Sequence, residues 1–122
     1  MTFATGLKTI LEAGTWTNYG STPPVKIIGI SSKRPNAYKG VLVKSTPKDY
    51  ESTFTSSLVF RRETGEILLY ERNQTKLDAL EDDLINIIAT GSDAIVLRDG
   101  DPIEDFGNPP QFELSVIAER LV

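Results

Sequence analysis

Apolar positions recur with a helical period in two stretches of the chain. The first stretch covers residues 2–13, where four apolar residues lie at helical offsets from one another. They are Phe3, Leu7, Ile10 and Leu11. We therefore predict a short amphipathic helix there, followed by a left-handed cap at Gly14.

The second stretch follows Thr75 and Asp78, which have the spacing of an N-terminal capping box. Thr75 is the predicted N-cap of a helix that ends at Gly91. Its apolar stripe consists of Leu77, Leu80, Leu84, Ile85, Ile87 and Ile88. Its polar face is expected to carry Asp78, Asp82, Asp83 and Asn86. Glu81 is predicted on the buried side, where a carboxylate requires an ion-pair partner, solvent or a neighbouring subunit.

Most of the remaining apolar runs have the composition of β-strands. Runs rich in β-branched and aromatic residues predict strands over 25–30, 40–44, 94–98 and 112–122. Residues 52–62 alternate between apolar and polar positions, and residues 67–72 form a further apolar run. Between them, residues 63–66 contain Gly65 and predict a tight turn, so the two runs are expected to pair as a β-hairpin.

These elements predict an α+β fold. Two helices pack on one face of a mostly antiparallel mixed sheet that has a prominent β-hairpin. A chain of 122 residues has room for one hydrophobic core, so we expect a single domain over residues 1–122.

Two connections between the predicted elements are polar. In residues 15–24, Trp16 and Tyr19 are expected to pin the linker over the core, and anchoring of a partner by one of them is the alternative. The second connection, residues 31–40, contains three cations and a ring: Lys33, Arg34, Lys39 and Tyr38. Such a set can contact phosphates and a base, but no nucleic-acid-binding motif surrounds it. A solvated or subunit-contacting arm is the favoured interpretation.

Histidine and cysteine are absent from the sequence. Their absence excludes Ser-His and Cys-His nucleophiles, imidazole zinc sites, thiolate metal sites and disulfides. Four carboxylates lie close together at Asp99, Asp101, Glu104 and Asp105, but their spacing does not match a calcium-binding loop. We therefore expect no enzymatic activity, no cofactor and no metal.

The sequence also gives no sign of a membrane segment. No apolar run approaches the roughly 18 residues of a membrane span. The first residues lack a basic leader followed by an apolar block, so no signal peptide is expected.

The predicted order of elements is close to that of metal-dependent nucleases of the restriction-enzyme type. Those enzymes require a Glu-x-Lys motif on a strand, because the carboxylates hold magnesium and the lysine stabilises developing charge. No glutamate of this chain is followed two residues later by lysine. A small nucleic-acid-associated or nuclease-like domain therefore stays as the alternative hypothesis only.

Charge is distributed unevenly along the chain. Residues 1–70 carry a net charge of +4 and residues 71–122 a net charge of −8. A chain with a basic and an acidic side can bind copies of itself head to tail, although two solvated faces of a monomer explain the same pattern. The candidates for such an interface are Lys33, Arg34, Tyr38, Lys39, Glu81, Asp82, Asp83, Asp99 and Asp101.

The layout of helix, strands with a hairpin, helix and final strands resembles the tail terminator and tail-completion (neck, head-to-tail joining) proteins of head-tailed viruses. The local features that carry this resemblance are a strand ending at residues 70–72, a capped turn, and an acidic helix over residues 77–88. Members are similar in their short N-terminal helix and their final strand. The long basic connection at residues 31–40 is where this chain departs from the family.

The resemblance implies a structural virion protein without catalytic activity. It implies a hexameric ring that caps the tail tube or joins it to the head. The expected partners are further copies of the chain, the tail tube and the connector or adaptor proteins. Viral DNA is expected to pass through the ring without sequence-specific binding, and assembly is expected in the host cytoplasm.

Overall fold

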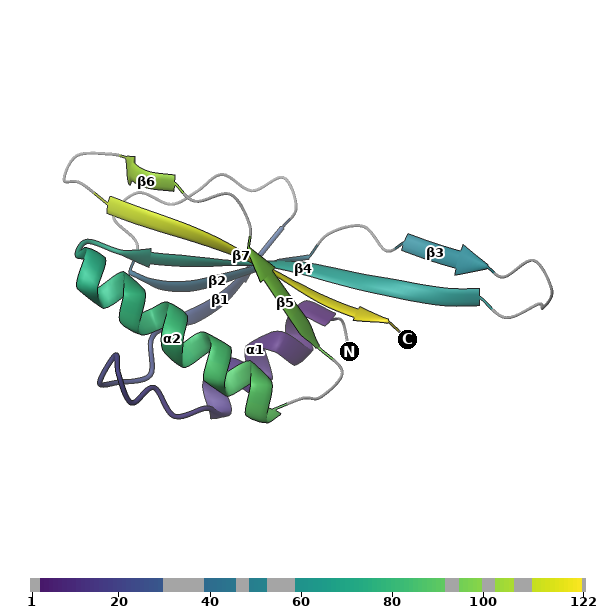
Figure 1. The fold of residues 1–122 in the computed structure, drawn as a ribbon, viewed down its shortest axis with the longest axis horizontal. Coiled ribbons are helices and arrows are strands. Elements are labelled where there is room, and N and C mark those ends of the chain that lie inside the picture. Colours follow the sequence, from purple (N-terminus) through teal and green to yellow (C-terminus); the bar gives the residue numbers. More distant parts are fainter. Residues whose placement is uncertain are drawn as a thin grey trace.

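The computed structural model describes residues 3–29, 39–45, 49–52, 59–91, 95–99, 103–106 and 111–121. These residues form two helices, α1 (Phe3–Ala13) and α2 (Gln74–Gly91), and a seven-stranded sheet (Figure 1). The strands are β1 (Val25–Ile28), β2 (Gly40–Ser45), β3 (Asp49–Ser52), β4 (Val59–Glu71), β5 (Val96–Asp99), β6 (Ile103–Phe106) and β7 (Gln111–Leu121).

The sheet is mixed and mostly antiparallel, as predicted. Its strands lie in the order β1-β2-β4-β7-β5, with β3 paired to β4 and β6 paired to β7. β1 and β2 are parallel, and every other pair is antiparallel. The long strands β4 and β7 pair from Arg62 opposite Leu121 to Glu71 opposite Phe112, so they form the centre of the sheet.

Both helices pack on the same face of this sheet, which confirms the predicted α+β class (Figure 1). Strand side chains such as Val41, Ile67 and Val116 form one core with the apolar sides of α1 and α2. The alternate residues Leu42 and Leu68 point to the opposite face, where they form a second, smaller cluster. The helix-covered face therefore contains the main core.

The predicted position of the hairpin is wrong. β4 continues through residues 63–66, where Gly65 pairs with Ser45 on β2 and Ala118 on β7. Gly65 does not have a positive φ, which only Gly20 and Gly40 show among the described glycines. It lies under α1 instead, because a Cβ atom there would be 3.1 Å from the Leu7 side chain. The glycine thus permits close packing of the helix on the strand.

The hairpin that the structure describes joins β3 to β4, with Asp49 opposite Arg62 and Ser52 opposite Val59. Most of the alternating stretch that predicted a strand over residues 52–62 lies outside the described residues. The sequence predicts a turn-rich loop over residues 99–111, and this prediction needs correction because the stretch contains β6, which pairs with β7.

Both predicted helix caps differ from those observed. Asn73 caps α2 in place of Thr75, since its Oδ1 accepts hydrogen bonds from the backbone N–H groups of Thr75 at 2.8 Å and Lys76 at 3.3 Å. Gly14 follows α1 without a left-handed backbone. A Cβ atom at Gly14 would lie 2.5 Å from Ile87, so this glycine permits close approach of the two helices.

Candidate functional site

The linker between α1 and β1 is held by two buried carboxylates, of which Asp83 is the first. Its side chain accepts hydrogen bonds from the backbone N–H groups of Asn18 at 3.2 Å and Tyr19 at 2.8 Å. Asp83 is only 3% exposed, which corrects its assignment to the polar face of α2. The backbone donors offset the cost of burying the carboxylate. Asp83 therefore holds the linker against α2 within the same chain and is not available as a contact for a neighbouring subunit.

Glu71, at the end of β4, is the second buried carboxylate. Its Oε2 accepts a hydrogen bond from the Tyr19 hydroxyl at 2.7 Å, and its Oε1 accepts one from the Arg72 backbone N–H at 2.8 Å. The exposed Lys39 ammonium lies 3.7 Å from Oε1. Lys39, a predicted interface cation, thus has an acidic partner within its own chain.

Trp16 completes the attachment of this linker. Its ring is buried in the core, and its Nε1 donates a hydrogen bond to the Leu11 carbonyl oxygen at 3.0 Å. Together with the hydrogen bond of Tyr19, this contact confirms the prediction that the two aromatic residues pin the linker. The sequence pattern did not reveal the two acids, because a buried carboxylate and a solvated one have the same local spacing.

Burial and the neighbouring Glu71 carboxylate raise the pKa of Tyr19 to about 12 from its ordinary value of 10.0. The folded protein holds this proton more tightly than the unfolded chain does. The resulting stabilisation is present below pH 10 and is lost as the pH rises towards 12. We expect the urea midpoint of the parent to fall over this range more steeply than that of Tyr19→Phe. Parallel pH profiles of the two proteins would contradict the assignment.

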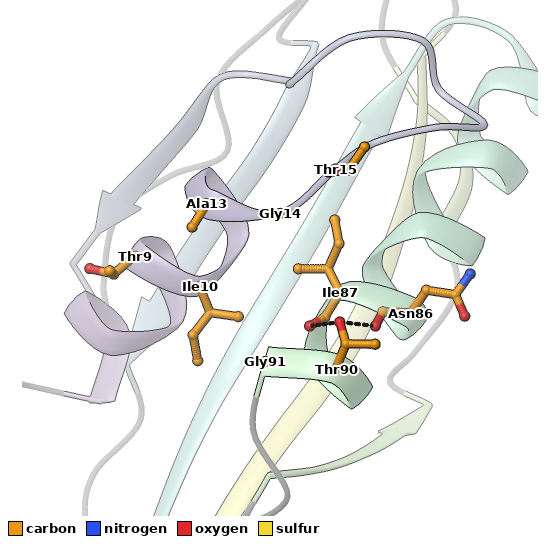
Figure 2. A pocket seen from close by; sticks show the side chains of 9 residues that line it. All are labelled: Thr9, Ile10, Ala13, Gly14, Thr15, Asn86, Ile87, Thr90 and Gly91. Carbon is orange, nitrogen blue, oxygen red and sulfur yellow. Dashed lines mark hydrogen bonds between the residues drawn. The ribbon is translucent and has the colours of Figure 1, made fainter.

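A groove of about 510 Å³ lies between the C-terminal ends of the two helices (Figure 2). Figure 2 shows Ile10 and Ile87 between the helices, where they form its apolar part. The Thr90 hydroxyl donates to backbone oxygens of its own helix, and the Thr9 hydroxyl donates to the Thr5 oxygen. The described lining contains no titratable side chain, so it offers no general acid or base there.

A smaller cleft of about 200 Å³ separates α2 from β5 and β7. It is lined by Glu81, Ile85, Leu97, Arg98 and Val116. Ile85 is 47% exposed, so its predicted place in the buried stripe is wrong. The buried side of α2 includes Asp83 and excludes Ile85. The reason is that the linker covers the Asp83 side of the helix and leaves the Ile85 side open. Glu81 is half-buried and lines this cleft, so it lies at the margin of the buried side, where the helix edge meets solvent.

The remaining predicted interface residues are distributed between described and undescribed parts of the chain. Asp82 is exposed on α2, and Asp99 is in β5 opposite Val116. The positions outside the described residues are Lys33, Arg34, Tyr38 and Asp101.

Two further features concern only the described part of the chain. It contains no group of three or more acidic residues placed to hold a metal ion. Neither α1 nor α2 combines the length and the apolarity that crossing a lipid bilayer requires.

Comparison of the sequence with protein-family models and with curated proteins gave no match.

Proposed function

We propose that this chain is a structural virion protein that forms a ring at the end of a viral tail tube or at the head-tail junction. The observation that carries the proposal is the β3–β4 arm, formed by residues 49–52 and 59–62. Figure 1 shows this arm extending away from the part of the sheet that the helices cover. An isolated two-stranded ribbon is only marginally stable, so such an arm is suited to contact with a neighbouring molecule.

Two of the buried acids also support a structural role. Glu71 and Asp83 are occupied by hydrogen bonds to the linker of the same chain. Both carboxylates hold the linker in place, so they are not available to bind a substrate. The uneven charge of the two halves of the sequence favours head-to-tail contact between copies. In this proposal the ring contacts the tail tube and connector proteins and needs no cofactor.

Native mass measurement of the full chain over a range of concentrations tests the proposal. A ring of six copies of the 13.5 kDa chain has a mass of about 81 kDa. A chain that stays monomeric even with tail tubes present, and that binds oligonucleotides with a steep salt dependence, would support the nucleic-acid-associated alternative.

Reversal of two positive charges in the connection over residues 31–40 is expected to weaken the ring. In a Lys33→Glu, Arg34→Glu double variant, like charges would meet at the interface, so we expect assembly to require about tenfold more protein at low salt. High salt should restore assembly, because screening removes the repulsion. A Lys8→Glu, Lys76→Glu variant has the same net charge and serves as the control. Equal assembly of the two variants at low salt would contradict the charge contribution.

A further inference from the structure

Exposed apolar side chains gather at the two edges of the sheet. Among the described residues, three large apolar side chains are exposed: Ile27 (43%), Ile85 (47%) and Val96 (65%). Ile27 is on β1, the strand at one end of the sheet order, and Val96 is on β5, at the other end. Ile85 borders the cleft between α2 and β5. In the described part of the chain, β1 pairs with β2 alone and β5 with β7 alone.

One edge presents an exposed apolar side chain and the other a cleft, and both are on the helix-covered face of the sheet. Val25 of β1 lies in the core beneath the helices, so Ile27, two residues later, points to the same face. The cleft beside β5 opens on that face, since Leu97 packs against the same core. Its volume of about 200 Å³ is below the roughly 300–1,000 Å³ of small-molecule pockets, which suits a single inserted side chain.

The two edges also differ in charge. β1 and β2 contain Lys26 and Lys44 and no acidic residue. At the other edge, Arg98 of β5 is paired with Glu119 at 3.3 Å, and α2 contains one lysine and three acidic residues besides the buried Asp83. Of these acids, Glu81 lines the cleft itself. Opposite charges at the two edges favour contact between different edges over contact between identical ones.

The strand directions permit the sheet to continue from one copy to the next. β1 and β2 run in one direction, β4 runs opposite to them, β7 runs with them, and β5 runs opposite again. If a second copy extends the sheet in the same orientation, its β1 lies antiparallel to β5 of the first copy. Antiparallel pairs are the commoner kind in sheets.

We infer that β1 of one copy pairs with β5 of the next copy and inserts Ile27 into the cleft beside Ile85. Such a contact joins different surfaces of identical chains, so it closes into a ring when the rotation per copy divides a full turn. The inference deepens the proposed function and rests on its ring-forming part. The partner surface is thus the opposite sheet edge of the same protein.

Disulfide trapping tests this pairing, because the chain contains no cysteine. Lys26→Cys and Val96→Cys place one thiol on each edge, and both positions are exposed on the face away from the helices. Within one chain these positions lie four strand spacings apart, roughly 19 Å, so they cannot join to each other. In the register that sets Lys26 directly opposite Val96, antiparallel strands bring the two Cα atoms to roughly 4.5–5.5 Å, within the range that a disulfide spans.

After mild oxidation, an equimolar mixture of the two single variants should give about tenfold more covalent dimer than either variant alone. The double variant should give a ladder of covalent multimers. A mixture of Thr9→Cys with Val96→Cys is the control, because Thr9 is also exposed but lies on α1. Dimers that form as readily from one variant alone, or from the control mixture, would overturn the pairing of β1 with β5.

Native mass measurement of the parent in the same samples separates this inference from the proposed function. A ring without cross-links between positions 26 and 96 overturns the edge pairing and leaves the ring in place. Cross-linked multimers that never cap tail tubes support the edge pairing and count against the virion role. A parent that is monomeric with and without tail tubes, and a mixture that does not cross-link, overturn both.

Discussion

Leu84→Ala is expected to lower the free energy of unfolding by about 2–5 kcal/mol. Leu84 is fully buried in the core between α2 and the sheet, so removal of its side chain loses apolar contact and leaves a cavity. Urea denaturation followed by circular dichroism measures the change. Asp82→Ala is the control, because Asp82 is exposed two positions earlier on the same helix and should change stability by less than about 0.5 kcal/mol. Similar midpoints for the two variants would contradict the packing of α2 on the sheet.

Asp83→Ala is expected to cost about 1–3 kcal/mol, although the sequence pattern assigns Asp83 to the polar face of its helix. The substitution leaves the backbone N–H groups of Asn18 and Tyr19 without their acceptor. Trp16 is the only tryptophan of the chain and lies in the same linker. Its fluorescence should therefore report release of the linker at a lower urea concentration than in the parent.

Asp78→Ala is the matched control for this second substitution. Asp78 is an exposed acid on the same helix, and it accepts one hydrogen bond from the exposed Gln74 side chain. We expect a change of less than about 0.5 kcal/mol there. If Asp83→Ala has the same small effect and leaves the fluorescence of Trp16 unchanged, the carboxylate does not clamp the linker.

Elements whose side chains follow one period could be predicted from the sequence. The helical spacing of Phe3, Leu7 and Leu11 gave α1, and all three side chains are buried in the core. Runs of β-branched and aromatic residues gave β1, β2, β5 and β7, because each of these strands packs at least one apolar side chain against the core. The α+β class followed from these elements.

Features that depend on contacts between distant segments could not be predicted. Residues 63–66 have the composition of a turn. Gly65 is nevertheless in the middle of β4, because α1 packs directly on it. Asp83 and Ile85 exchange their expected exposures because the linker over residues 15–24 covers one side of α2 and not the other. A local pattern contains no information about which segment will cover a helix.

The candidate interface residues also depend on contacts that a local sequence pattern does not reveal. Charge asymmetry in the sequence indicated a basic and an acidic surface, but Lys39 and Asp83 are engaged within the chain. The exposed apolar residues at the sheet edges emerge only from the strand order, since Ile27 and Val96 have the local sequence of buried strand residues.

Electron microscopy of tail tubes tests the central claim most directly. The proposed function requires that the genome encoding this chain also encode a tail tube protein. The two proteins are therefore produced together, and the tube ends are imaged with and without the chain. We expect a sixfold ring at one end of each tube when the chain is present, and bare ends when it is absent. Bare ends in the presence of a folded chain, verified by the fluorescence of its buried Trp16, would contradict the proposed function.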